Sequence, residues 1–366
     1  MKVVDLFAGC GGLSHGFIAN GFTVEKAVEF DASIANTYKK NHSEVDLIID
    51  DIKNIDNSGF FKLGDADVII GGPPCQGFSM AGARIRQGFI DDPRNYLFKH
   101  YFNVVKEVKP KIFVMENVKG MLTMQNGMIF EEIMNIFSNA DMLDGQPYQL
   151  FYRVVRTVEF GIPQKRERLI IIGTTIENVE FDELWERTKD EIRRDIPSFF
   201  NLVSIDDAIG NLPEVTSDGK IANPIPQTEY QKYLACDLEI IENHTQTKHS
   251  DIVNERIKQV KSGENFTVLD EEINSVHSGS YGRLSWNEQA PTITTRFDTP
   301  AGGRFIHPTA NRTLTPREAA RIQSFPDDFV FYGAKRLISK QIGNAVPPKL
   351  SYFLARLTKN ILSFEQ

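Results

Sequence analysis

The sequence predicts an α/β protein with a mostly parallel sheet and a second, smaller and irregular domain. In the first half of the chain, short apolar runs alternate with helical patterns, and each run ends in a polar or Gly-rich cluster. After about residue 175 this alternation gives way to an acidic helical stretch and then to a region rich in Asn, Thr, Pro and Gly. We therefore expect a first, discontinuous domain over residues 1–175 and 336–366, and a second over residues 176–335.

The composition is that of a globular protein. Of the 366 residues, 41% are apolar and 25% are charged, which suffices for a sizeable core and excludes a disordered or fibrous chain. The opening MKVVDLFAGC does not fit a signal peptide, and no later run approaches the roughly 18 apolar residues of a membrane span. Cys10, Cys75 and Cys236 are odd in number and form no CxxC pair. We expect a cytoplasmic protein with reduced thiols, no metal site and no membrane contact.

The charge is unevenly distributed along the chain. The formal net charge of −8 disfavours a polyanionic partner at first sight. Much of the acidity falls in residues 177–214, however, whereas residues 153–168 and 283–321 carry more basic than acidic side chains. We expect these two stretches to supply basic surface for nucleic acid.

The first apolar run leads into the Gly-rich turn DLFAGCGG, which opens a helix. Gly9, Gly11 and Gly12 allow a ligand to approach the backbone at the helix N-terminus. Glu29 ends the second run and can accept hydrogen bonds from both hydroxyls of a ribose, and Phe30 can stack on adenine. A Gly-rich turn by itself is about as often a plain connection, but the combination favours a ligand that contains adenosine.

The segment GGPPCQGFS places Cys75 in a non-helical turn at a strand end. A cysteine without a partner is more often inert, because reactivity requires a lowered thiol pKa. Glu116 and Asn117 end the strand KIFVMEN, and QKRER places Arg166 and Arg168 on one face if this segment is extended. A thiol, a carboxyl group and guanidinium groups at neighbouring strand ends are what nucleophilic attack on a pyrimidine requires.

Two helices are expected near the end of the chain. LTPREAARIQSFPDDF has Thr315 at the N-cap position, Pro316 at the first helical position and Glu318 at the capping-box position. QIGNAVPPKLSYFLARLTKNIL closes the chain with a further helix. Without the other motifs, QIGNAVPP is interpreted equally well as a turn before that helix.

Five of these segments resemble the motifs of bacterial DNA (cytosine-5)-methyltransferases of restriction-modification systems. DLFAGCGG, PPCQGFS, ENV, QKRER and QIGNAVPP stand in that family's order, and together they are far more specific than any one of them. The resemblance implies a Rossmann-like S-adenosylmethionine-dependent methyltransferase domain and a target-recognition domain. It also implies double-stranded DNA as the partner, S-adenosyl-L-homocysteine as a product, no metal, a monomer, and association with the nucleoid through DNA.

The resemblance also implies roles for single residues. Cys75 would attack C6 of a cytosine and form a transient covalent adduct, Glu116 would bind or protonate N3, Arg168 would hold O2, and Arg166 would support the site. Because C5 and C6 cannot be reached inside stacked DNA, the cytosine must be flipped out, and residues 76–94 would close over it.

Cofactor and DNA contacts follow in the same way. Similarity implies cofactor contacts by Phe7, Gly9, Gly11, Glu29, Phe30, Asp51, Ile52, Pro73, Leu97, Asn344 and Val346. The last two imply that the closing helix returns to pack beside the first motif. The expected DNA contacts are Ser79, Arg84, Arg283, Arg296 and Arg304.

Three alternatives compete with this interpretation. A nicotinamide-dependent dehydrogenase would share the α/β pattern and Glu29, but it would not explain GGPPC, ENV and QKRER together. A tRNA methyltransferase of the same superfamily would share the chemistry, although the long region between QKRER and LTPREA better suits a DNA-reading domain. A catalytically silent, binding-only relative would be expected to lack the nucleophile, and Cys75 is present.

Overall fold

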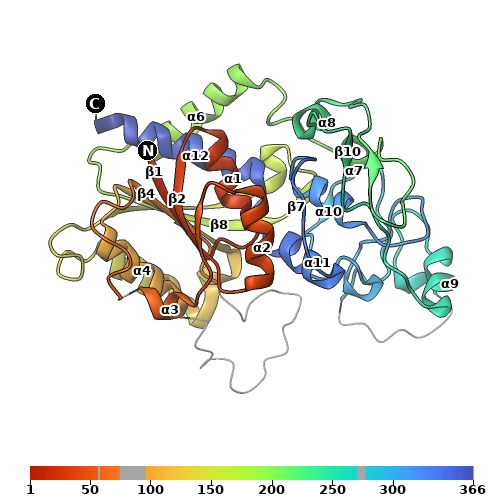
Figure 1. Cartoon of the computed structure of the whole chain (residues 1–366), viewed down its shortest axis with the longest axis horizontal. Coiled ribbons are helices and arrows are strands. Elements are labelled where there is room, and N and C mark those ends of the chain that lie inside the picture. Colours follow the sequence, from red (N-terminus) through yellow and green to blue (C-terminus); the bar gives the residue numbers. More distant parts are fainter. Residues whose placement is uncertain (57, 75–95, 270–276, 366) are drawn as a thin grey trace. The chain divides into compact units, whose positions relative to one another are not determined.

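The computed structural model describes residues 1–56, 58–74, 96–269 and 277–365 (Figure 1). The contacts within the chain define two compact units. Unit 1 comprises Met1–Val155, Glu167–Ile196 and Leu350–Gln366, and unit 2 comprises Arg156–Arg166 and Pro197–Lys349. The functional division expected from the sequence, residues 1–175 with 336–366 against 176–335, stays a prediction.

Unit 1 is built on a seven-stranded sheet with the strand order β3-β2-β1-β4-β5-β8-β6. Strands β1 to β5 pair in parallel, whereas β8 pairs antiparallel with β5. The mostly parallel α/β sheet expected from the sequence is confirmed, and the carboxyl ends of β1, β2, β4 and β5 lie along one edge. The strands are β1 (Lys2–Leu6), β2 (Thr23–Val28), β3 (Asp46–Ile48), β4 (Val68–Gly71), β5 (Ile112–Val118), β6 (Gln149–Arg156) and β8 (Glu167–Thr174).

The helices of unit 1 bury apolar faces against this sheet. In α4, residues three and four apart in sequence are buried, including Tyr101 and Val105, as expected for an amphipathic helix. The buried hydroxyl of Tyr101 donates to the carbonyls of Ile69 in β4 and Val114 in β5, at 3.1 and 3.2 Å. The helical elements are α1 (Gly12–Ala19), α2 (Ala32–Asn41), α3 (Ile52–Ile55), α4 (Leu97–Val108), η3 (Lys119–Gly127), α5 (Met128–Ser138), α6 (Phe181–Asp195), α12 (Pro348–Leu362) and η7 (Ser363–Glu365).

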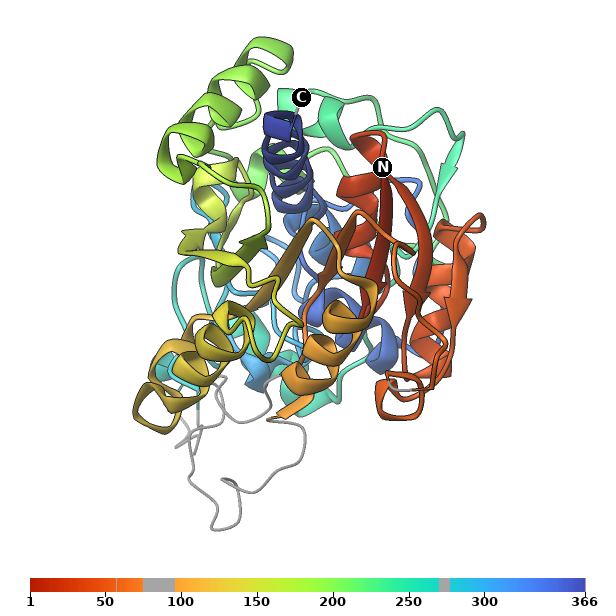
Figure 2. The same ribbon diagram turned by 90° about the vertical axis from the view of Figure 1, so that its left-hand side faces the viewer.

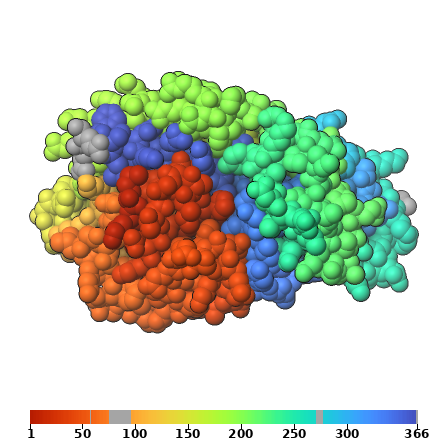
Figure 3. Space-filling view, turned by 45° about the horizontal axis from the view of Figure 1, so that its top comes forward, coloured from red at the N-terminus to blue at the C-terminus, as the bar shows by residue number. Residues whose placement is uncertain are grey.

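The closing helix α12 packs against α1 and α6, next to which it lies in Figures 2 and 3. Gly16 in α1 permits this approach, because a Cβ atom there would lie 2.3 Å from the backbone nitrogen of Tyr352. On the other side, the rings of Trp185 and Phe353 lie 4.6 Å apart between centroids. The expected return of the closing helix to the first motif is confirmed.

Unit 2 has short elements and long connections, as the irregular composition of this part of the chain predicted. Its strands form two two-stranded sheets, β10-β9 and β11-β7. The elements are η4 (Thr157–Phe160), β7 (Gln164–Lys165), α7 (Ile205–Ile209), β9 (Ile221–Ala222), α8 (Glu229–Leu234), β10 (Ile240–Ile241), α9 (Asp251–Gln259), η5 (Phe266–Val268), β11 (Ala290–Pro291), η6 (Pro300–Gly302), α10 (Pro316–Ile322) and α11 (Lys335–Asn344).

Helix α10 begins as predicted. The side chain of Thr315 accepts a hydrogen bond from the Glu318 N–H, and the Glu318 carboxylate accepts one from the Thr315 N–H at 2.7 Å. This capping box satisfies donors that the first turn of a helix otherwise leaves open.

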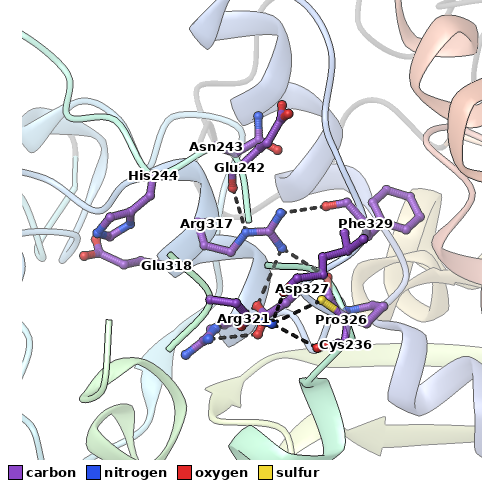
Figure 4. A network of polar contacts seen from close by, with 12 residues as sticks. Cys236, Glu242, Asn243, His244, Arg317, Glu318, Arg321, Pro326, Asp327 and Phe329 are labelled. Atoms are coloured by element: carbon purple, nitrogen blue, oxygen red, sulfur yellow. Dashed lines mark hydrogen bonds and ion pairs between the residues drawn. The ribbon is translucent and has the colours of Figure 1, made fainter. Parts of the chain in front are cut away.

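Around α10, unit 2 is held together by buried arginines (Figure 4). Arg321 pairs with both oxygens of Asp327 at 2.8 Å, and Arg317 donates to three carbonyls, those of Glu242, Pro326 and Phe329. Arg312 pairs with Glu318. The expectation that residues 283–321 supply a basic surface is therefore wrong for these three arginines, because their charges are buried and paired.

Candidate active site

The site in unit 1 is assembled from the adjacent ends of β4 and β5. These strands are parallel, with Gly71 opposite Met115, so Gly72 and Glu116 follow at the same edge. Gly72 lies close to the Glu116 side chain, since a Cβ atom on Gly72 would be 3.3 Å from Glu116 Oε2. The backbone that leads into the PPC motif thus passes directly beside a carboxyl group.

A hydrogen bond fixes this backbone to β5. The side-chain amide of Asn117 donates to the carbonyl of Pro73 at 2.8 Å, and Asn117 is buried. The backbone N–H of Val118 in turn donates to the Asn117 side-chain oxygen at 2.9 Å, which sets the orientation of the amide. The residue two positions after Pro73 is Cys75, which lies outside the described residues.

Glu116 and Arg168 form an ion pair across β5 and β8. Arg168 lies opposite Val118 in the antiparallel register, and its Nε is 2.8 Å from Glu116 Oε1. Burial lowers the pKa of the Arg168 guanidinium, and the Glu116 carboxylate partly offsets that effect. Both side chains remain slightly accessible, at 12% and 10%, so a ligand at the strand ends could reach them.

The described cysteines are poor nucleophiles. Burial raises the pKa of the Cys10 thiol to about 12, and burial also raises the pKa of the Cys236 thiol. Both thiols therefore stay protonated near neutral pH. Of the three cysteines in the sequence, Cys75 is left as the candidate for thiolate chemistry.

The Gly-rich turn and the end of β2 are joined through Glu29. One carboxylate oxygen of Glu29 accepts the Gly9 N–H at 2.9 Å, and the other accepts the Asp31 N–H at 2.8 Å. Phe7 and Gly9 have positive φ angles of 60° and 58°, which a tight turn requires here. Next to Glu29, the ring of Phe30 is 72% exposed, as a stacking surface for an adenine must be.

The other predicted cofactor residues of unit 1 flank the same edge. Asp51 caps α3 by accepting the Lys53 N–H at 3.1 Å, and Ile52 is buried beneath it. Leu97 is buried at the start of α4. Asn344 and Val346 belong to unit 2, where Asn344 is exposed and Val346 is buried. Their proposed contact with a cofactor stays a prediction.

A buried polar chain beneath the Gly-rich turn was missed in the sequence. Ser14 Oγ donates to Asp5 at 2.6 Å and lies 2.8 Å from the Tyr38 hydroxyl, and burial raises the pKa of the Asp5 carboxyl to about 7. His42 Nε2 lies 3.1 Å from the Gly11 carbonyl, which can only accept, so the ring is protonated at Nε2. Only Asp5 falls within a motif, and its burial depends on α1 and α2 packing over it.

The predicted DNA contacts differ in their surroundings. Ser79 and Arg84 lie outside the described residues, as does the proposed closing loop over residues 76–94. Arg296 is exposed, and Arg304 is partly buried and donates to the carbonyls of Glu264 and Arg283.

Arg283 does not fit the expected role. Its guanidinium is buried, and all five N–H donors are used. They reach the carbonyls of Val260, His307, Ala310 and Ile257 and the side chain of Asn311. The structure favours a role of Arg283 in holding unit 2 together over the predicted contact with DNA.

Arg166 also differs from Arg168. It is buried in unit 2 and donates to the carbonyls of Ile293, Gly343 and Ala345.

Among the described residues there is no group of three or more His, Cys, Asp or Glu side chains that could hold a metal ion. In the described part of the chain, every helix is too short or too polar to span a membrane.

The class that this fold and strand-end geometry define is a methyltransferase with an α/β catalytic unit. The family model for C-5 cytosine-specific DNA methylases matches residues 1–360. The chain belongs to this family and is a DNA cytosine methyltransferase.

Relatives and solved structures agree. The chain is 33% identical to the Type II methyltransferase M.DdeI of Desulfomicrobium norvegicum, over 97% of this chain and 88% of that protein. It is also 33% identical to the Type II methyltransferase M1.HphI of Haemophilus parahaemolyticus, over 97% and 86%. A crystal structure described as a DNA modification methyltransferase encoded within an E. coli prophage matches with a TM-score of 0.77 and 30% identity, over 99% of each chain.

Proposed function

We propose that this protein is the sequence-specific DNA (cytosine-5)-methyltransferase of a restriction-modification system, and that it transfers a methyl group from S-adenosylmethionine to C5 of a flipped cytosine through a covalent Cys75 adduct. The observation that carries this proposal is the hydrogen bond from Asn117 to the Pro73 carbonyl. It holds the backbone that precedes Cys75 beside Glu116 and its partner Arg168.

The chemistry follows from these groups. The Cys75 thiolate adds to C6 of the cytosine, and the electrons of the C5–C6 double bond move toward C5 and N3. Glu116 offsets the negative charge by a hydrogen bond or proton at N3, and Arg168 holds O2. S-adenosylmethionine would supply the electrophilic methyl group that C5 takes up and would leave as S-adenosylhomocysteine. A base then removes the C5 proton, the C5–C6 double bond re-forms, and Cys75 leaves as a thiolate.

Several residues of unit 1 suit an adenosine-containing cofactor. Glu29 is held in place by two backbone N–H groups, so its oxygens are fixed before a ribose arrives. Phe30 offers an exposed ring beside it. Phe7, Gly9, Gly11, Asp51, Ile52, Pro73 and Leu97 of unit 1 are further proposed cofactor contacts, and the family resemblance assigns the same role to Asn344 and Val346.

The substrate is double-stranded DNA, and the enzyme acts as a cytoplasmic monomer that meets the nucleoid through this substrate. Chemistry at C5 and C6 requires base flipping, which costs a few kcal/mol of stacking and pairing energy. Ser79, Arg84, Arg296 and Arg304 are the proposed DNA contacts. Arg283 is left out because its donors are used inside unit 2.

A covalent trapping experiment tests the mechanism. The target sequence is first found by bisulfite sequencing of a host without cytosine methylation after expression of this protein. A duplex with 5-fluorocytosine at the target position should then form a denaturant-resistant adduct, because fluorine cannot leave as a proton does. Cys75→Ser should form no adduct and show no turnover, yet bind S-adenosylmethionine. Turnover of Cys75→Ser near the wild-type rate would refute the covalent mechanism, and methylation of tRNA in place of duplex DNA would refute the proposed substrate.

A further inference from the structure

Three backbone carbonyls at the end of α11 are each held by a buried side chain of unit 2. Gln323 donates to the Ile342 carbonyl at 2.7 Å. Arg166 donates to the Gly343 carbonyl at 3.0 Å and to the Ala345 carbonyl at 3.2 Å. Arg166 and Gln323 are essentially inaccessible. The backbone on both sides of Asn344 is therefore fixed, while Asn344 itself is exposed.

Arg166 also holds a second segment, which follows β11. Arg166 donates to the Ile293 carbonyl at 3.3 Å, and the Ile293 N–H donates to the Gln164 side chain at 2.7 Å. Gln164 and Gln323 are joined to each other by a hydrogen bond of 2.8 Å. One buried network thus holds residues 342–345 and Ile293.

The two segments also touch directly. A Cβ atom on Gly343 would lie 2.4 Å from the carbonyl carbon of Thr294, so only glycine allows the two backbones to approach this closely. From Thr294 the chain continues into a turn over residues 295–298 that carries the exposed Arg296. Displacement of either segment would therefore displace the other.

We propose that Arg166 is a positioning residue that couples Asn344, on the cofactor side, to the turn carrying Arg296, on the DNA side. This inference rests on the proposed function. In this role Arg166 does not touch the cytosine. A planar guanidinium can donate to three carbonyls from different nitrogen atoms at once, whereas the three N–H donors of a lysine ammonium share one nitrogen and cannot keep this arrangement.

The shared network predicts that cofactor binding and DNA binding are coupled. A shift of residues 342–345 on cofactor binding at Asn344 would be passed through the shared hydrogen bonds to Ile293 and to the turn that carries Arg296, so one ligand would favour the backbone arrangement that the other requires. By linkage, DNA must raise cofactor affinity by the same factor. The wild-type enzyme should therefore bind S-adenosylhomocysteine about 5-fold or more tightly when a target duplex is present, a factor within the usual range of coupling between sites.

The test measures this coupling factor in the wild type and in two variants. The dissociation constant of S-adenosylhomocysteine is determined by calorimetry for the full chain, with and without target duplex. Arg166→Lys should reduce the coupling factor to about 1, with KM values for cofactor and DNA rising more than kcat falls. Arg317→Lys is the matched control, because Arg317 also is buried and donates to three carbonyls. It should lower thermal stability but keep the coupling factor.

The outcomes separate this inference from the proposed function. A folded Arg166→Lys enzyme that keeps the wild-type coupling factor, or that loses only kcat, overturns the positioning role. Equal loss of coupling in Arg317→Lys would overturn it as well, since the effect would then be general destabilisation. If Arg166→Lys does not fold, Gln323→Met replaces it and should reduce coupling in the same direction. Failure of the wild-type enzyme to trap 5-fluorocytosine refutes the covalent mechanism, whereas trapping without coupling refutes only this inference.

Discussion

Each unit contains a close ion pair, and the two pairs differ in how far their bonding capacity is used. In unit 1, Arg168 meets Glu116 through Nε, and both side chains remain about a tenth accessible. In unit 2, Arg321 donates to both carboxylate oxygens of Asp327 and to the Ala208 carbonyl. The side chains of Arg321 and Asp327 are only 1% and 2% exposed. The first pair can still be reached by a substrate, whereas the second is enclosed by its own unit.

The difference has a physical basis. A buried charge must be paired and hydrogen-bonded, because its removal from water costs several kcal/mol. A pair that uses most of its hydrogen-bonding groups, such as Arg321 with Asp327, therefore stabilises the packing of a unit that has few long helices or strands. A pair at the end of a sheet can leave hydrogen-bonding capacity for a ligand, and its loss should affect chemistry more than folding.

The largest effect should come from breaking the pair in unit 1. Glu116→Gln keeps the shape of the side chain but cannot transfer a proton to N3, so kcat should fall by roughly 10²–10⁴. The melting temperature should fall less than in an Arg321→Met variant, because the Gln side-chain oxygen can still accept a hydrogen bond from Arg168 Nε. Steady-state methylation gives kcat, single-turnover methylation separates the chemical step from product release, and thermal unfolding gives the melting temperature. A kcat within a few-fold of wild type would exclude Glu116 from the chemistry.

Breaking the pair in unit 2 should have the opposite signature. Arg321→Met leaves Asp327 buried without its main partner, which should cost about 3–5 kcal/mol of unfolding free energy. Urea unfolding measures the loss, and the double variant Arg321→Met with Asp327→Leu should recover part of it, since the unpaired carboxylate is gone while Arg317, 3.8 Å from that carboxylate, keeps its three bonds to carbonyls. If the single and double variants are equally unstable, the unpaired charge is not the cause.

These two pairs also show how far sequence reasoning reaches. The alternation of strands and helices, the shared edge of the strand ends and the Thr315 cap follow from local patterns, and the structure confirms them. The burial of Arg317 and Arg321 does not follow, because an arginine in a helix has the same local pattern whether its face meets solvent or another segment. The partners of Arg166 lie more than a hundred residues away in sequence, so no local spacing could identify them.

DNA binding should distinguish the exposed Arg296 from the buried Arg283. Arg296 is exposed, so Arg296→Ala should leave folding unchanged and act on DNA alone. A contact with a base should cost about 1–3 kcal/mol on the target sequence and relax one position, whereas a phosphate contact should weaken binding to all sequences and reduce the salt slope by about one. Binding to target and mismatched duplexes at two salt concentrations distinguishes these outcomes. Unchanged affinity throughout would remove Arg296 from the interface.

The smallest effect is expected at Lys349 in unit 2, whose ammonium group lies over aromatic rings. Lys349 Nζ is buried, 3.1 Å from the Gly161 carbonyl, and lies over the rings of Phe199, Tyr230 and Tyr233 at 4.6–5.3 Å. A cavity of about 200 Å³ adjoins it and is also lined by Asp207 and Glu229. Burial lowers the pKa of the Lys349 amine to about 7, while the three rings favour the charged form.

The sign of the pH dependence follows from this pKa. Between about pH 7 and the ordinary lysine value of 10.5, the unfolded chain binds one proton more at this amine than the folded chain does. The contribution of Lys349 to stability therefore rises with pH across this window and is lowest at or below pH 7. Lys349→Met removes the amine, so its stability relative to wild type should be greater at pH 7 than at pH 9.5. Because the rings offset part of the burial cost, we expect a change of roughly 1–2 kcal/mol. Urea unfolding of wild type and Lys349→Met at the two pH values measures this change, and the neighbouring titratable groups Asp207, Glu229, Tyr230 and Tyr233 are present in both proteins. If the two proteins differ by the same unfolding free energy at both pH values, Lys349 stays charged in the folded state.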